Sequence, residues 1–138
     1  MQERHSAALG QIYKSDRLKI SYVPQDTSFL SGNLLEYAKT ECLDETLFMT
    51  ILNKLDFYKM QFEKDMKDFS AGQKKKVLLA RSLSQKAHLY IWDEPLNYID
   101  IFSRMQIENL ILHFKPSMIF IEHDRVFCEN IATQIVDL

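Results

Sequence analysis

Two adjacent carboxylates, Asp93 and Glu94, close an apolar segment of the sequence and are followed by a proline. The two carboxylates of such a pair can take separate roles in nucleotide hydrolysis. One carboxylate helps to hold a magnesium ion, usually through water, and the next accepts a proton from the attacking water. The alternative is a strand that ends in two solvated acids, and this short segment alone leaves both interpretations open.

A second feature is the predicted start of a helix at Ser70, three residues before Gln73. This spacing is typical of a capping box. A helix N-terminus presents unpaired N–H groups and the positive end of its dipole, which suit a phosphate, and Gly72 permits a close backbone approach. Taken alone, the segment favours a well-capped helix.

Three further polar positions follow predicted strands or the acidic pair. Gln25 comes after Pro24 at a strand end, His123 follows the apolar run 118–121, and the loop 97–100 ends in Asp100. An amide can contact magnesium or water, and an imidazole can bind a terminal phosphate. The simpler interpretations are a polar turn after proline, a surface histidine and an ordinary turn.

The surrounding pattern predicts an α/β fold. Residues 18–23, 88–92 and 118–121 are predicted strands, residues 31–62 are mostly helical, and residues 102–114 carry apolar residues at helical spacing. Continuous apolar strands separated by helices indicate a parallel sheet that is buried on both faces. Ligand chemistry in such sheets gathers beyond the carboxyl ends of the strands, where the acidic pair and His123 fall.

The composition is that of an ordinary globular protein. The chain has 138 residues, of which 46% are hydrophobic and 26% charged, and its net charge of −2 argues against a whole-surface nucleic-acid binder. No apolar run is long enough to cross a bilayer, and the first residues lack the core of a signal peptide. With two cysteines only, Cys42 and Cys128, we expect a reduced cytoplasmic protein without stable membrane insertion.

The order and spacing of these features resemble the ATP-binding-cassette (ABC) ATPases. Gln25 matches the Q-loop, residues 68–83 the signature helix, Asp93-Glu94 the Walker B strand, Asp100 the D-loop and His123 the switch histidine. The resemblance implies part of a P-loop NTPase core with a parallel sheet and a helical signature subdomain. It further implies a division into residues 1–30, which end in the Q-loop, a helical subdomain 31–70, and a half 70–138 with the signature helix, Walker B and switch histidine.

The resemblance also implies roles for the site residues, with ATP and Mg²⁺ as cofactors. Glu94 would be the general base and His123 would contact the γ-phosphate, so these two are the expected catalytic residues. Asp93 and Gln25 would serve the metal. The expected nucleotide-binding residues are Gln25, Ser70, Ala71, Gly72, Gln73 and Asp100, and the signature residues would clamp a nucleotide held by a partner cassette.

Residues 93–100 resemble the ABC-F subfamily, tandem cassettes that act on ribosomes. Leu96 and Tyr98 replace the commoner Thr and His, and with the Ile-Glu-His-Asp run at 121–124 they are similar to the second cassette of members that protect ribosomes and confer antibiotic resistance. Phe69 and Ala71 depart mildly from the usual Leu and Gly. Two alternatives stay open: the nucleotide-binding domain of a membrane transporter, and a non-catalytic interaction remnant.

The P-loop motif G-x-x-x-x-G-K-S/T does not occur in the 138 residues. This motif supplies the phosphate cradle and its lysine, so we expect the isolated chain to be inactive and to expose a sheet edge through which it self-associates.

The run Lys74-Lys75-Lys76 is predicted to be a solvated helix face rather than an RNA contact. Trp92 is predicted to lie in the core, and the histidines and cysteines show no metal-ligand spacing.

Overall fold

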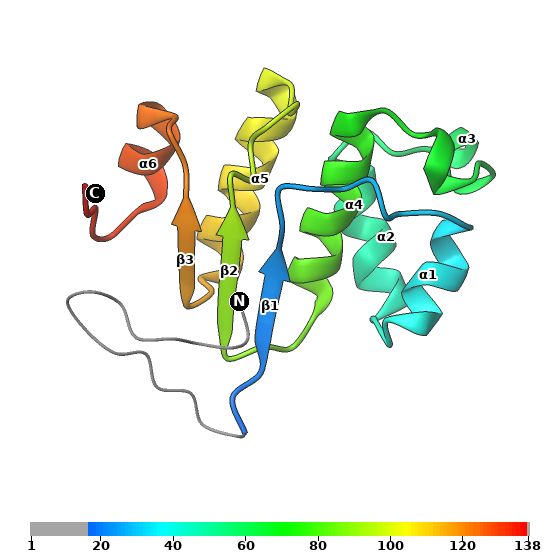
Figure 1. Ribbon diagram of the computed structural model, residues 1–138, viewed down its shortest axis with the longest axis horizontal. Helices are drawn as coiled ribbons and strands as arrows, with labels where there is room; N and C mark the ends of the chain where they lie inside the picture. The colour runs from blue at the N-terminus through cyan, green and yellow to red at the C-terminus, as the bar shows by residue number, and fades with distance from the viewer. Residues whose placement is uncertain (1–16, 138) are drawn as a thin grey trace.

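A three-stranded parallel sheet organises the protein, and the computed structural model describes residues 17–137. The strands are β1 (Ile20–Val23), β2 (Leu89–Asp93) and β3 (Met118–Ile121), in the order β1-β2-β3 (Figure 1). The predicted α/β class with a parallel sheet is therefore confirmed. The strand boundaries are close to those predicted, with β1 starting two residues later and β2 extending to Asp93.

Polar side chains start most of the helices. Asn33, Asp44, Asp100 and Asp124 each accept a backbone N–H as N-caps. The capping box predicted at Ser70 is confirmed, with both of its hydrogen bonds to and from Gln73 present. The helices are α1 (Leu34–Thr40), α2 (Glu45–Lys54), α3 (Lys59–Phe62), α4 (Ala71–Ser84), α5 (Ile101–Phe114) and α6 (Arg125–Ile131), with a 3₁₀ turn at Met66–Asp68.

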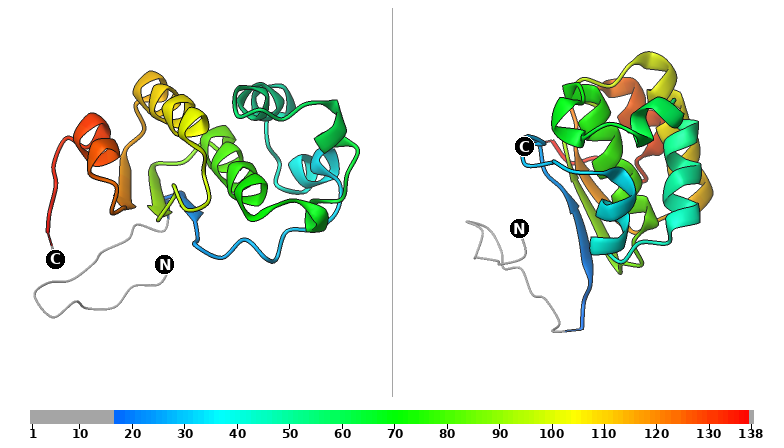
Figure 2. Two further views of the ribbon diagram at one scale, coloured as in Figure 1. Left: turned by 90° about the horizontal axis from the view of Figure 1, so that it is seen from above. Right: turned by 90° about the vertical axis from the view of Figure 1, so that its right-hand side faces the viewer.

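The described helices lie on one face of the sheet, which gives two layers (Figure 2). Val23, Trp92 and Phe120 are paired in register across the three strands, and they face these helices. Trp92 is fully buried, as predicted, and its Nε1 donates to Ser82 Oγ at 2.9 Å. One hydrophobic cluster connects the sheet with α1, α2, α4, α5 and α6, and α2 packs on α4.

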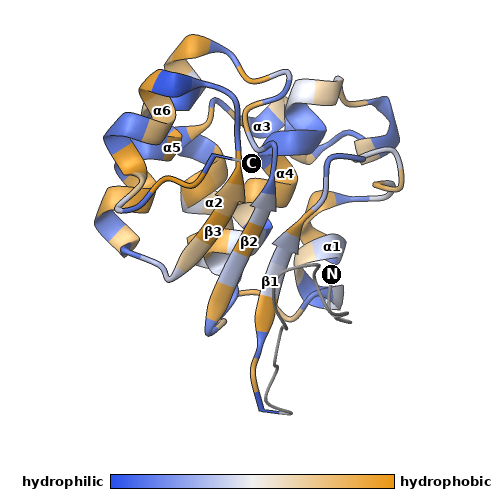
Figure 3. Cartoon of the chain, turned by 60° about the vertical axis from the view of Figure 1, so that its left-hand side comes forward, coloured by the Kyte–Doolittle hydropathy of each residue, from blue (hydrophilic) through white to orange (hydrophobic). Residues whose placement is uncertain are grey.

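The opposite face of β3 is open within the described part of the chain. Ile119 and Ile121 are 56% and 53% exposed, so the prediction of strands buried on both faces is wrong for β3. The physical reason is that the helices within residues 17–137 cover only the other face of the sheet. Figure 3 shows the hydrophobic colouring of this strand.

No helix within residues 17–137 combines the length and the apolar character needed to cross a membrane.

Candidate functional site

The predicted site residues meet in two pairs at the carboxyl ends of the strands. Gln25 Nε2 donates to Asp93 Oδ1 at 3.1 Å, which joins the segment after β1 to the end of β2. His123 Nε2 lies 3.0 Å from Glu94 Oε1, which joins the segments after β2 and β3. Because the strands are parallel, these four side chains share one edge of the sheet, as predicted for ligand chemistry in such folds.

Gln25 and Asp93 have the chemistry of magnesium ligands. Their mutual bond uses the amide nitrogen of Gln25, so the amide oxygen and the second Asp93 oxygen are not part of it. Mg²⁺ prefers oxygen ligands and usually takes only one or two carboxylates, together with waters and substrate phosphates. Within residues 17–137, no group of three or more His, Cys, Asp or Glu residues is arranged to hold a metal. The donor set therefore fits a magnesium ion that substrate and water help to coordinate.

Glu94 and His123 differ in their access to solvent. The Glu94 side chain is 20% exposed, whereas the His123 side chain is 83% exposed. Asn97 Nδ2 also approaches the second Glu94 oxygen, at 3.5 Å. A mostly buried carboxylate beside an exposed imidazole can accept a proton from a water molecule while the imidazole contacts a ligand from solvent.

The first turn of α4 lies beside the acidic edge. A pocket of about 500 Å³ opens between the Gln25 segment, this turn and the loop after β2. Gln25 and Ala71, both predicted site residues, line it, together with Asp26, Thr27, Ser28, Lys74, Asn97 and Tyr98.

Gly72 makes close packing between α4 and the loop after β2 possible. A Cβ atom at this position would lie 2.4 Å from the backbone oxygen of Tyr98, far inside van der Waals contact. The close approach that Gly72 permits in this structure is therefore to the Tyr98 backbone, whereas the sequence pattern suggests an approach to a phosphate.

Asp100 binds within the chain through both of its oxygens. One accepts the N–H of Ser103 at 3.1 Å and so caps α5, and the other lies 3.2 Å from Lys76 Nζ. Burial opposes ionisation of this carboxyl, but hydrogen bonding from Ser103 and the Lys76 ammonium lower its pKa to about 2. Asp100 is thus tied both to α5, which it caps, and to Lys76 on α4.

The prediction of a solvated lysine run is wrong, because Lys75 and Lys76 are 0% and 9% exposed. Lys75 Nζ donates to the backbone oxygens of Pro24 and Gln25, at 3.0 and 3.3 Å. Burial lowers the pKa of Lys75, and the nearby carboxylates of Asp93, Glu94 and Glu122 oppose that effect. Helical spacing would have revealed this position, since residues 78, 79 and 82, three, four and seven residues on, are all buried.

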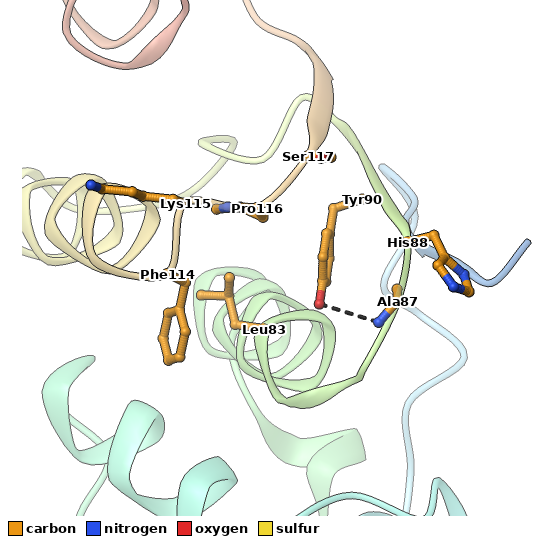
Figure 4. Close-up of a pocket in the computed structure, with 8 residues that line it drawn as sticks. All are labelled: Leu83, Ala87, His88, Tyr90, Phe114, Lys115, Pro116 and Ser117. Carbon is orange, nitrogen blue, oxygen red and sulfur yellow. Dashed lines mark hydrogen bonds between the residues drawn. The ribbon is translucent and has the colours of Figure 1, made fainter.

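A second, smaller pocket lies at the other end of the sheet, next to the starts of β2 and β3 (Figure 4). It measures about 270 Å³, and Tyr90 donates its hydroxyl to Gln85 O at 2.6 Å beside it. None of the predicted site residues lines this pocket. Its lining residues are Leu83, Ala87, His88, Tyr90, Phe114, Lys115, Pro116 and Ser117.

The sequence matches a known protein family and several curated relatives. Residues 2–97 match the family described as "ABC transporter". The chain is 30% identical over 135 residues to the "Probable ATP-binding protein YbiT" of Escherichia coli O157:H7, covering 94% of this chain and 26% of that protein. It is 35% identical over 111 residues to the "ATP-binding protein Uup" of Escherichia coli K12, covering 77% and 18%. The chain thus spans about a quarter or less of the length of these curated relatives.

Solved structures share the fold. The archaeal ribosome recycling factor aABCE1, solved with the ribosomal stalk protein aP1, aligns with a TM-score of 0.73 at 21% identity, over 88% of this chain and 25% of that one. A putative ABC transporter ATP-binding protein from Pyrococcus furiosus aligns with a TM-score of 0.65 at 20% identity, over 80% and 60%.

Proposed function

The chain belongs to the ABC transporter family, and we propose that it is the part of an ATP-hydrolysing cassette that handles the attacking water, the metal and the terminal phosphate. The proposal rests chiefly on the two contacting pairs, Gln25 with Asp93 and Glu94 with His123, at one edge of the sheet. A cassette needs such groups within reach of one another, because phosphoryl transfer depends on positioning and electrostatic stabilisation more than on covalent chemistry.

In this proposal each polar group has one task. Glu94 accepts the proton of the attacking water, and His123 donates a hydrogen bond to the terminal phosphate from its exposed position. Asp93 and Gln25 hold Mg²⁺, which neutralises phosphate charge when it is bound. Lys75 keeps the Gln25 backbone against α4 through its two carbonyl contacts, so the amide stays beside Asp93.

The first turn of α4, here called the signature turn, binds a second nucleotide in this proposal. Ser70, Ala71, Gly72 and Gln73 form the N-terminal end of α4, where backbone N–H groups and the helix dipole favour phosphate. This turn would clamp ATP held by a partner cassette, with the Asp100 loop beside it. The Lys76–Asp100 contact would keep the turn and the loop in one arrangement.

We further propose that the chain is part of an ABC-F-type protein of the cytoplasm, which acts on ribosomes and protects them against antibiotics. The support is the similarity of residues 93–100 and 121–124 to that subfamily, and the structural likeness to a protein named as a ribosome recycling factor. The family description favours a second candidate, the nucleotide-binding domain of a transporter. Co-sedimentation with purified ribosomes, compared with binding to membrane vesicles, separates the two.

Calorimetric titration with MgATP tests the nucleotide site. We expect no measurable binding by the 138-residue chain and clear binding by a longer version that carries a P-loop ahead of residue 1, because the phosphate cradle and its lysine belong to that motif. In the longer version, Asp93→Asn weakens the Mg²⁺ dependence of binding, whereas Asp56→Asn, two residues after α2, does not. Tight binding by the 138-residue chain, or a longer version that never binds, contradicts the proposal.

A further inference from the structure

The carboxylate of Glu122 joins two loops of the site. Glu122 directly follows β3, and its Oε2 accepts the backbone N–H of Leu96 at 3.1 Å. Its Oε1 accepts the backbone N–H of His123 at 2.9 Å and that of Asp124 at 3.4 Å. One side chain therefore connects the loop after β2, which carries Glu94, with the loop after β3, which carries His123.

The loop after β2 needs such support because its backbone is strained. Glu94 has a φ of 49°, in the left-handed region that residues with a side chain rarely adopt. Strained conformations of this kind persist when the surrounding structure fixes them. Two contacts to the β3 side do so here: Glu94 N–H donates to Ile121 O at 2.8 Å, and Leu96 N–H donates to Glu122.

His123 depends on the same carboxylate from the other side. Its side chain is 83% exposed, so apart from the contact with Glu94 Oε1 at 3.0 Å, packing does little to confine the ring. The bond from its own N–H to Glu122 Oε1 fixes the backbone from which the ring projects. Charge-assisted hydrogen bonds of this kind are stronger than those between neutral groups.

We propose that Glu122 is a positioning residue that sets the geometry of the Glu94–His123 pair by holding both loops through backbone N–H groups. Its oxygens accept backbone N–H groups of both loops, so it acts through the pair. The consequence for catalysis rests on the proposed ATPase function. The effect of Glu122 on the two loops is independent of that function, and it is measurable in the 138-residue chain alone.

Amide hydrogen exchange, followed by NMR, tests the two contacts directly. We expect Glu122→Ala to speed exchange at the Leu96 and His123 amides by about tenfold, because each amide loses a charged acceptor. Glu122→Gln keeps one acceptor oxygen and should speed exchange chiefly at one of the two amides. The matched control is Glu129→Ala, which removes an exposed carboxylate from α6 and should change neither amide.

Exchange at buried strand and helix amides, such as Trp92 and Leu79, shows whether each variant keeps its fold. If Glu122→Ala unfolds the chain, exchange at the Leu96 and His123 amides in Glu122→Gln tests the proposal instead. Unchanged exchange at both Leu96 and His123 in a folded variant overturns the proposal.

Steady-state ATP hydrolysis by the longer, P-loop-carrying version tests the catalytic consequence. Glu122→Ala should lower kcat about tenfold and leave KM for MgATP within about twofold, because misplacement of the pair affects the transition state more than substrate binding. An unchanged kcat in a variant with faster loop exchange refutes the positioning role. If the wild-type longer version hydrolyses no ATP, the proposed function fails, and the exchange data still decide whether Glu122 holds the loops.

Discussion

Replacing Asp100 by Asn should remove the charge of this residue and keep its helix cap. Asn and Asp are about equally good N-caps, so the bond from Ser103 N–H should survive, whereas the contact with Lys76 Nζ loses its ionic character. Lowering the pKa of Asp100 from 3.8 to about 2 corresponds to about 2.4 kcal/mol of stabilisation. Because the side chain is 52% exposed, solvent screening reduces the expected loss to about 1 kcal/mol.

The pH dependence follows from the direction of this pKa shift. Between pH 3.8 and about 2 the unfolded chain binds more protons at Asp100 than the folded chain, so the stabilisation declines as the pH falls through this window. It is complete above about pH 5 and is reduced to about half at pH 3. The difference in free energy of unfolding between wild type and Asp100→Asn should shrink in the same proportion.

Urea unfolding at pH 7 and pH 3, followed by circular dichroism, measures these differences. Asp100→Ala should cost about 2 kcal/mol at pH 7, because it loses the cap as well as the charge. Lys76→Met completes a double-mutant cycle, in which we expect a coupling energy of about 1 kcal/mol between the two side chains. A coupling energy near zero, or an Asp100→Asn effect that is equal at both pH values, would refute this account of the ion pair.

Three further predictions concern other contacts. Gly72→Ala should destabilise the chain by about 1–3 kcal/mol in thermal unfolding, because the added Cβ would lie 2.4 Å from Tyr98 O. Helix propensity alone predicts the opposite, a stabilisation of about 1 kcal/mol. A net stabilisation would therefore contradict the close approach. Because the pKa of Lys75 is lowered, the unfolded state binds more protons than the folded state just below pH 10.5, and the free energy of unfolding should increase as the pH rises there. Lys75→Met should remove this increase. Equal pH profiles of stability for wild type and Lys75→Met would contradict the prediction. The 138-residue chain should self-associate through β3 in ultracentrifugation and Ile119→Lys should reduce this, whereas a mainly monomeric wild type at high concentration contradicts it.

Local patterns in the sequence were sufficient for much of the fold. The Ser70–Gln73 spacing predicts a capping box because both of its hydrogen bonds lie within one helical turn. The apolar runs predict β2 and β3, and the rule that parallel strands end at one edge places Gln25, Asp93 and His123 together from the sequence alone. Short-range chemistry and one topological rule therefore locate the candidate site.

Features that depend on distant contacts were missed. The run of like charges predicts a solvated Lys75; helical spacing with buried residues 78, 79 and 82 indicates its burial, but not its partners, which are carbonyls 51 and 50 residues earlier in the chain. Glu122 and Leu96 are 26 residues apart, and no local pattern pairs a carboxylate with that N–H group. The open face of β3 depends on which elements cover the sheet, and the apolar sequence of the strand does not decide that.

ATP turnover by Glu94→Gln tests the central claim most directly. In the longer version that carries a P-loop, Gln at this position keeps the size of the side chain and cannot accept the proton of water, so we expect kcat to fall by about 100-fold or more while MgATP still binds. Glu63→Gln, an exposed change at the end of α3, is the matched control and should turn over like wild type. Undiminished turnover by Glu94→Gln would contradict the role of Glu94 as the general base.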